Sequence, residues 1–322
     1  MQTREQLYKT AFRQIQSSRQ KAVVMADQKR QIAFEKIPQL PKLLGELNRN
    51  KALASRYSVL GSSEQVEQQK TVILNSEKEL QQLLIEYGYN EHSFDPQFSC
   101  SLCQDRGEYQ GKTCRCVHLL VRQLRRKEIS AISALELSTF ESFRMEYYPD
   151  YYMPEYQGNP RKHMEEILGY CKQYAEHFTT KNPNLLMTGT AGLGKTHLAL
   201  SIANTAIQRG ADVIYISSRN LFDQMEREKF AVSSDLRQMV MEAELLILDD
   251  LGTEFLTQYG ISFLYDIVNS RILRRLPTIY TTNILKEDML RARYTEKTAS
   301  RLLGSCELLN FWGNDIRLLE NG

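Results

Sequence analysis

The second half of the sequence predicts an α/β fold built on a parallel sheet, and the first half predicts helices. From residue 161 onward, short apolar runs alternate with segments of helical periodicity. These runs are apolar throughout, which is typical of strands that are covered on both faces and joined by crossover helices. We therefore expect a parallel five-stranded sheet. The predicted strands are Leu185–Thr188, Val213–Ser217, Leu245–Leu248, Thr278–Thr282 and Leu308–Phe311.

Length and charge limit the organisation of the protein. At 322 residues the chain is long enough for an α/β core and a smaller second domain. The 41 Lys and Arg residues nearly balance the 39 Asp and Glu residues, so any contact with nucleic acid must come from a local patch. No apolar run is long enough to cross a bilayer, and the first ten residues are too polar for a signal peptide. We expect a cytoplasmic protein with no membrane partner.

Residues 1–135 are expected to form a helical domain. Gly is scarce there, and apolar residues recur at helical spacing, for example at Leu40, Leu44 and Leu47. These apolar stripes either form a small core or dock a partner protein, and the sequence leaves both open. Residues 136–160 are rich in Tyr and broken by Pro, which predicts an irregular linker or collar packed against the next domain, residues 161–322.

Four of the six cysteines lie in the short segment CSLCQDRGEYQGKTCRC. The pattern is C-x-x-C, then ten residues, then C-x-C, and such clustering in a reducing compartment indicates a metal site more than disulfides. Four thiolates fit tetrahedral Zn²⁺, and a closed four-cysteine site is normally structural. The expected ligands are Cys100, Cys103, Cys114 and Cys116, with His118 or His92 as an alternative to one cysteine because C-x-C is a tight spacing.

A basic helix follows the cysteine segment. It carries Arg122, Arg125, Arg126 and Lys127, which form a compact positive patch. Such a patch either contacts phosphates or is simply a solvated helix face. Lys162, Arg219 and Arg227 offer other contacts for nucleic acid, with no motif to favour them.

The segment GTAGLGKT, Gly189–Thr196, matches G-x-x-x-x-G-K-T and lies between a predicted strand and a predicted helix. Glycines at these positions let the backbone fold tightly, so that successive N–H groups and the helix N-terminus surround phosphates. Lys195 is placed to reach the β- and γ-phosphates, and the Thr196 hydroxyl to bind Mg²⁺. The expected ATP-binding residues are Gly189, Thr190, Ala191, Gly192, Leu193, Gly194, Lys195, Thr196 and His197.

Two further strands are expected to deliver polar groups to the same sheet edge. The run LLILDDLG ends in Asp249 and Asp250, and TIYTTN ends in Asn283. Ligands bind at the carboxyl ends of parallel strands. Asp249 would hold Mg²⁺, Asp250 would polarise the attacking water, and Asn283 would hold the same water against the γ-phosphate. The alternative for each is a polar strand end without a function.

In this order, the loop, the acidic strand and the Asn-ended strand resemble the Walker A, Walker B and sensor-1 elements of AAA+ ATPases. The resemblance covers residues 160–322. Only about forty residues follow Asn283, which is too few for the usual helical lid. With DDLG in place of Asp-Glu, the chain resembles the DnaC/DnaI helicase loaders and the IstB-like transposition helper ATPases.

That resemblance implies two further roles. Arg301, in EKTASRLL, would be a finger that reaches the γ-phosphate of a neighbouring subunit, so self-association through the ATPase domain is expected. Arg317, in NDIRLL, would sense phosphate in the same chain. A surface or core arginine is the alternative for each. With Asp250 where many relatives have Glu, hydrolysis is expected to be slow, which suits a timer or switch.

As a whole, the chain resembles a bacterial or phage helicase loader. The resemblance implies that residues 1–135 bind the hexameric replicative DNA helicase, that the ATPase domain engages single-stranded DNA in the primosome, and that ATP hydrolysis or release frees the helicase. An IstB-like helper, which would bind duplex DNA and a transposase, generally lacks a zinc-bearing domain. A third possibility is a nucleotide-dependent adaptor without useful hydrolysis. A small-molecule kinase has no acceptor motif here to support it.

Overall fold

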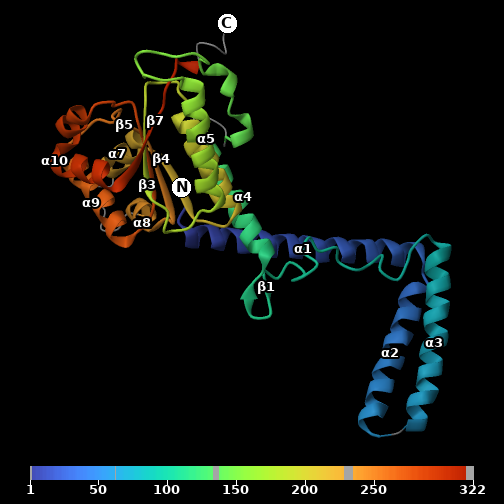
Figure 1. Ribbon diagram of the computed structural model, residues 1–322. Helices are drawn as coiled ribbons and strands as arrows, with labels where there is room; N and C mark the ends of the chain where they lie inside the picture. The colour runs from blue at the N-terminus through green and yellow to red at the C-terminus, as the bar shows by residue number, and fades with distance from the viewer. Residues whose placement is uncertain (1, 62, 133–137, 228–234, 317–322) are drawn as a thin grey trace. The chain divides into compact units, whose positions relative to one another are not determined.

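The computed structural model describes residues 2–61, 63–132, 138–227 and 235–316 (Figure 1). The chain divides into two compact units. One comprises residues 1–11 and 117–322, and the other comprises residues 12–116. Of the described helices, none combines the length and apolar character that a bilayer span requires.

The larger unit is built on a parallel five-stranded sheet, as the sequence predicted. Its strands are β3 (Asn184–Thr188), β4 (Val213–Ser217), β5 (Leu245–Leu251), β6 (Thr278–Thr282) and β7 (Cys306–Asn310). They lie in the order β4-β5-β6-β3-β7, and every neighbouring pair is parallel. Strand β7 begins two residues earlier than predicted and ends before Phe311. Strand β5 is longer than predicted, with a register shift between Leu248 and Leu251, where the two aspartates lie.

Helices cover both faces of this sheet. They are α5 (Pro160–Glu176), α6 (Lys195–Gln208), α7 (Ser218–Arg227), α8 (Asp235–Glu242), α9 (Gln258–Arg274) and α10 (Glu287–Ser305). Leu185 and Met187 of β3 pack into the core beneath α5 and α6, whereas Leu186 packs into the core beneath α7 to α10. This alternation explains why the predicted strands are apolar throughout. In the described residues after β7, up to Ile316, no helical lid follows.

Residues 138–159, which precede α5, contain two short 3-10 helices, Phe140–Ser142 and Met145–Tyr147. Phe140, Phe143 and Tyr148 are buried in the core formed by α5 and α6. We call residues 138–159 the collar. Because these aromatic side chains are buried, the collar is an ordered part of the larger unit's core in spite of its irregular backbone.

The smaller unit contains most of α1 (Arg4–Lys36), then α2 (Leu40–Val59), α3 (Ser63–Glu86) and a hairpin of β1 (Glu108–Tyr109) and β2 (Lys112–Thr113). Helices α2 and α3 lie side by side and run antiparallel (Figure 1). The buried cluster here is small and consists of Ala33, Ile37, Leu40, Leu84 and Phe94. On the same two helices Val59, Leu74 and Ile85 are exposed. The apolar residues of α2 and α3 are therefore only partly buried in a core.

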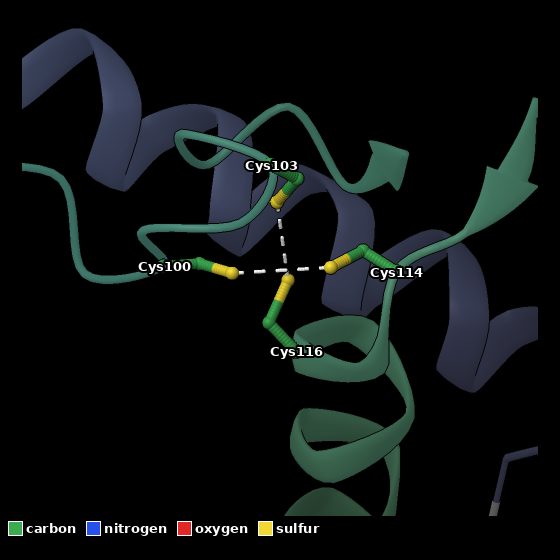
Figure 2. A group of neighbouring side chains, drawn as sticks. All are labelled: Cys100, Cys103, Cys114 and Cys116. Atoms are coloured by element: carbon green, nitrogen blue, oxygen red, sulfur yellow. Dashed lines mark hydrogen bonds between the residues drawn. The ribbon is translucent and has the colours of Figure 1, made fainter. Parts of the chain in front are cut away.

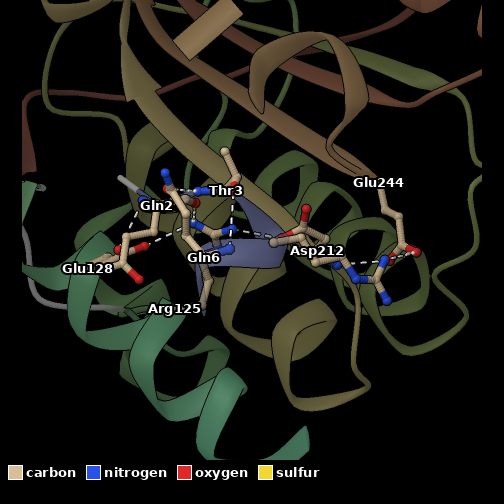
Figure 3. Close-up of polar contacts among 8 residues, drawn as sticks. Gln2, Thr3, Gln6, Arg125, Glu128, Asp212 and Glu244 are labelled. Atoms are coloured by element: carbon tan, nitrogen blue, oxygen red, sulfur yellow. Dashed lines mark hydrogen bonds and ion pairs between the residues drawn. The ribbon is translucent and has the colours of Figure 1, made fainter. Parts of the chain in front are cut away.

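The first residues of the chain pack with the larger unit through Arg125 of α4 (Arg115–Ile132), as Figure 3 shows. Arg125 is 2% exposed. Its Nη1 donates to Gln2 O at 2.8 Å and to Glu128 Oε2 at 2.9 Å, and its Nη2 donates to Asp212 Oδ1 at 2.9 Å. Nearby, Arg4 forms an ion pair with Glu244 at 2.9 Å. Two carboxylates thus neutralise the buried guanidinium, and Arg125 and Glu128 hold the amino-terminal segment through their hydrogen bonds with Gln2.

This arrangement differs from the sequence-based organisation in two respects. Residues 1–11 and 117–132 belong to the same unit as the five-stranded sheet, whereas the sequence predicts one separate domain over residues 1–135. Arg125 is a buried clamp, so it does not belong to the exposed patch of Arg126 and Lys127. Helical periodicity identifies which face of a helix is apolar, but it does not identify the element against which that face packs.

We expect Arg125→Met to lower the free energy of unfolding by about 2 to 4 kcal/mol, because it leaves two carboxylates without their buried counter-charge. The exposed Arg126→Met is the matched control and should change the free energy of unfolding by less than about 0.5 kcal/mol. Urea unfolding followed by circular dichroism measures both. Equal midpoints for the two variants would contradict a clamping role for Arg125.

Candidate functional site

The loop between β3 and α6 has the backbone geometry of a phosphate-binding loop. Gly192 and Gly194 have φ values of +76° and +83°, in the left-handed region that favours glycine. A Cβ atom on Gly192 would lie 1.6 Å from Asp315 Oδ1, and one on Gly194 would lie 2.7 Å from Phe143 Cε2. Gly194 is the N-cap of α6. The loop therefore leads directly into a helix N-terminus, where free N–H groups and the helix dipole favour anions.

Lys195 lies in the first turn of α6 and is 5% exposed. Its Nζ donates to Gly189 O at 2.8 Å, to Thr190 O at 2.7 Å and to Asn283 Oδ1 at 2.8 Å. Asn283 follows β6, which is the neighbour of β3 in the sheet. The structure thus brings together two of the predicted site residues, which are 88 positions apart in sequence.

Asp249 of β5 is 4% exposed, and its carboxylate accepts three hydrogen bonds from hydroxyl groups. Its Oδ1 accepts from Thr196 Oγ1 at 2.9 Å and from Thr281 Oγ1 at 2.6 Å, and its Oδ2 accepts from Tyr215 OH at 2.7 Å. The structure therefore places the two predicted magnesium ligands, Thr196 and Asp249, in contact. A hydroxyl and a carboxylate are the oxygen donors that Mg²⁺ prefers, so this pair fits the ion.

The sequence reading missed Tyr215 and Thr281, which orient Asp249 from either side. Tyr215 belongs to β4 and Thr281 to β6, the two strands that flank β5. Thr281 lies near the carboxyl end of β6, whereas the hydroxyl of Tyr215 reaches Asp249 from the middle of β4. A hydroxyl-bearing side chain within each of these predicted strands was the signal that could have found them.

Asp250, the second aspartate, has a φ of +58°, which is uncommon for a residue other than glycine. Its N–H donates to Thr281 Oγ1 at 2.8 Å, and its carbonyl accepts from Thr253 Oγ1 at 2.9 Å. These bonds hold the strained backbone. Asp250 lines a cavity of about 210 Å³ together with Lys195, Thr196 and Asn283.

The collar forms another wall of this cavity through Ser142, Phe143, Arg144 and Tyr147. It is joined to the phosphate-binding loop by Tyr148, whose OH donates to Leu193 O at 2.9 Å. His197 of α6 contacts the collar as well, with its Nε2 3.0 Å from Thr139 O. Burial raises the pKa of Tyr148, so the hydroxyl stays protonated as a donor. The sequence predicts that the collar packs on this domain, and the structure adds that it lines the site.

Of the two predicted arginines, the structure describes only Arg301. Arg301 lies in α10 after a kink at Thr295, and its guanidinium lies 5.8 Å from the ring centre of Tyr265. It is not among the described residues that line the cavity of its own chain. Arg317 lies outside the described residues. The role of each arginine stays a prediction.

The smaller unit contains a second candidate site, in which the sulfur atoms of Cys100, Cys103, Cys114 and Cys116 converge (Figure 2). All four lie within 4.8 Å of one another, with the Cys100–Cys114 pair at 3.8 Å and the Cys103–Cys116 pair at 3.5 Å. Tetrahedral zinc with Zn–S bonds of about 2.3 Å requires sulfur separations of about 3.8 Å. The cluster therefore fits such an ion.

Main-chain contacts shape this cysteine cluster. The buried carboxylate of Asp105 accepts from the N–H groups of Ser99 and Cys100, both at 2.8 Å. Burial acts to raise the pKa of the Cys103 thiol, but the hydrogen bond with the Gly107 main chain and those with the other cysteines outweigh it. Together they lower this pKa to about 7, which favours a thiolate.

Neither alternative histidine joins the cysteines in the metal-capable group found among the described residues. His118 Nδ1 lies 2.7 Å from Tyr8 OH. His92 is exposed and lies beside Asp95, with its Nδ1 2.8 Å from Asp95 Oδ2. The cluster therefore consists of the four cysteines.

Relatives of known sequence match part of the chain. The DnaC replicative helicase loader of Escherichia coli K12 is 28% identical over 125 residues, which cover 38% of this chain and 51% of DnaC. A putative ATP-binding protein of insertion sequence IS5376 from Geobacillus stearothermophilus is 29% identical over 153 residues, which cover 44% of this chain and 59% of that protein. The chain thus spans about half the length of the curated relatives that it matches.

Among solved structures, the DnaC helicase loader aligns with a TM-score of 0.47 and 20% identity, over 54% of this chain and 97% of that one. DnaI aligns with a TM-score of 0.43 and 16% identity, over 55% and 89%. The sequence model of the family described as IstB-like ATP binding protein matches residues 119–321, which is more than half of the chain. The chain therefore belongs to the IstB-like ATP-binding protein family.

Proposed function

We propose that this protein is an ATPase that loads a replicative DNA helicase onto single-stranded DNA. The observation that carries the ATPase part is the convergence of Lys195, Asn283 and the Thr196–Asp249 pair at one cavity beside a helix N-terminus. Family membership supports ATP binding. The relatives named as helicase loaders support the biological role.

Each side chain in the cavity has a definite chemical task in this proposal. The N–H groups at the start of α6 bind phosphate oxygens, and Lys195 exchanges its carbonyl partners for the β- and γ-phosphates. Thr196 and Asp249 hold Mg²⁺, which supplies positive charge against the phosphates. Asp250 and Asn283 hold the attacking water in line with the γ-phosphate. The collar side chains Phe143 and Tyr147 enclose the part of the nucleotide beyond the phosphates.

Hydrolysis in this proposal requires a second subunit. Arg301 projects from α10 of one chain to the γ-phosphate bound by its neighbour, where its charge stabilises the transition state. Its absence from the lining of its own cavity supports a role in trans. Hydrolysis then depends on assembly, which suits a switch that reports whether subunits have gathered around DNA.

The smaller unit is the proposed helicase-binding part. In it, Cys100, Cys103, Cys114 and Cys116 hold structural Zn²⁺, and the exposed apolar residues of α2 and α3 contact the helicase. Val59 is 88% exposed and Ile85 is 63% exposed, which is unfavourable unless a partner covers them. Single-stranded DNA would contact the ATPase unit.

A transposition helper ATPase is the second candidate function. It is favoured by the relative from insertion sequence IS5376, which resembles this chain as closely as DnaC does. Such a protein would bind duplex DNA and a transposase. The nucleotide chemistry would be the same, so the partner and the form of DNA distinguish the two functions.

Lys195→Ala should weaken ATP binding by about 100-fold, because it removes charge-assisted contacts with the phosphates worth about 1.5 to 3 kcal/mol each. Lys181→Ala, at an exposed position, is the matched control and should leave the affinity unchanged. Isothermal titration with ATP and Mg²⁺ measures both. Unchanged affinity in Lys195→Ala would overturn the assignment of the nucleotide site.

Cys103→Ser should release zinc, because a closed four-cysteine site loses a ligand that the remaining three cannot replace. Zinc content by plasma mass spectrometry and far-ultraviolet circular dichroism measure the effect. Cys306→Ser, which changes a cysteine outside the cluster, should keep the wild-type zinc content. A metal content that is equal in the two variants would contradict the four-cysteine site.

The helicase role is tested by co-purification of the full chain with the host replicative helicase in the presence of ATP or ADP. We expect binding that is lost in the double variant Leu74→Glu with Ile85→Glu, because charge then replaces the apolar contact surface. Leu273→Glu, which changes an exposed residue of α9, is the control and should still bind. Absent binding in every nucleotide state, together with preference for duplex DNA, would favour the transposition helper.

A further inference from the structure

Glu254 lies three residues beyond the end of β5 and is a buried carboxylate to which the proposed mechanism gives no role. The residue is 3% exposed. A carboxylate in such a position needs several donors, because burial removes its hydration. Its Oε2 accepts from the Gly252 N–H at 2.9 Å and lies 2.8 Å from Ser218 Oγ. Its Oε1 accepts from Tyr294 OH and lies 3.5 Å from Arg293 Nε.

Ser218 connects Glu254 to the main chain of Asp250. The Ser218 hydroxyl is fully buried and lies 2.7 Å from Asp250 O as well as 2.8 Å from Glu254 Oε2. It has a single hydrogen, which these two acceptors share. Glu254 also binds the main chain at Gly252, two residues after Asp250, through the Gly252 N–H. Glu254 therefore holds the turn that begins at Asp250 at two points.

This bracing matters because Asp250 holds a strained backbone conformation. Its φ of +58° costs free energy, and such conformations persist only where the surroundings determine them. Rotation of this backbone to an ordinary strand conformation would move the Asp250 carboxylate away from the cavity. The bonds to Ser218 and Gly252 oppose that rotation.

On its other side, Glu254 is bound to α10. Tyr294 is fully buried, and Arg293 Nη2 donates to Glu254 O at 2.6 Å. These two residues immediately precede Thr295, where α10 is kinked with a φ of +72°. The half of α10 beyond the kink carries Arg301. One buried carboxylate thus joins the end of β5 to the helix of the proposed finger.

We propose that Glu254 is a positioning residue for ATP hydrolysis. It fixes the Asp250 main chain through Ser218 and Gly252, and it anchors that main chain to α10 through Tyr294. The inference rests on the proposed ATPase function and deepens it. A carboxylate that only stabilised the fold would affect the unfolding temperature without a selective effect on turnover.

Three variants remove parts of this network with little change in volume: Tyr294→Phe, Ser218→Ala and Glu254→Gln. Tyr174→Phe is the matched control, because it removes another buried tyrosine hydroxyl, one that donates to Pro183 O at 2.9 Å. Ser218→Thr keeps the hydroxyl and serves as the conservative rescue.

Hydrogen exchange of the nucleotide-free full chain tests the network without any assumption about ATP. Tyr294→Phe should raise the exchange rates of the amides of residues 249–254 by about fivefold, since a buried hydrogen bond is worth about 1 kcal/mol. The same amides should keep wild-type rates in Tyr174→Phe. Equal rates in the two variants would overturn the proposed connection from α10 to Asp250.

Steady-state ATPase assays test the catalytic consequence. Tyr294→Phe and Ser218→Ala should each lower kcat by about tenfold with KM for ATP within about twofold, because the groups that bind the phosphates are unchanged. The double variant Tyr294→Phe with Ser218→Ala should lose little more kcat than either single variant. Ser218→Thr should keep most of the wild-type kcat. If Tyr294→Phe and Ser218→Ala keep the wild-type kcat and only lower the unfolding temperature, Glu254 has a structural role only and the proposal is overturned.

The two levels of inference fail differently. If the wild-type protein binds no ATP or does not hydrolyse it, the proposed function fails and the role of Glu254 in hydrolysis fails with it. If the wild-type protein hydrolyses ATP and all three variants keep its kcat, the ATPase function stands and only the inference about Glu254 is overturned.

Discussion

The carboxylate of Asp249 is the point at which the elements of the nucleotide unit meet. It is buried near the carboxyl end of β5, which lies between β4 and β6 in the sheet, and it accepts hydrogen bonds from hydroxyl groups of β4, β6 and α6. A buried carboxylate is tolerated only when donors surround it, so the side chains of three neighbouring elements must hold a common position. The order β4-β5-β6-β3-β7 is what supplies those donors at one sheet edge. Lys195 and Asn283 extend the same arrangement to the loop before α6.

Buried charge also organises regions away from the nucleotide cavity. Arg125 holds the first residues of the chain through Gln2 O and is itself paired with Glu128 and Asp212. Glu254 holds the turn after β5 against α10. In each case a single charged group joins segments that are distant in sequence. Such groups specify one arrangement strongly, because any alternative packing would leave a buried charge unpaired.

The smaller unit is stabilised in a different way. Its described apolar cluster is limited to a few residues of α1, α2, α3 and Phe94, which is little for a stable independent core. Four converging cysteines offer a second source of order, since metal binding contributes directly to folding in small domains. The exposed apolar residues on α2 and α3 are then free for a partner. This division agrees with the proposed function, in which one part binds nucleotide and the other binds another protein.

The sequence by itself determined the strands, the phosphate-binding loop, the two aspartates, Asn283 and the four cysteines, because each depends on local spacing and residue type. Apolar runs gave the strands, and the glycines of Gly189–Gly194 gave the loop. Tertiary structure decided which residues from other segments contact them. Tyr215, Thr281 and the collar residue Tyr147 reach the site only because the sheet and the collar bring distant segments together. The sequence gives no signal for the roles of Arg125 and Glu254, since each depends on a partner more than thirty residues away, Asp212 for the first and Ser218 for the second.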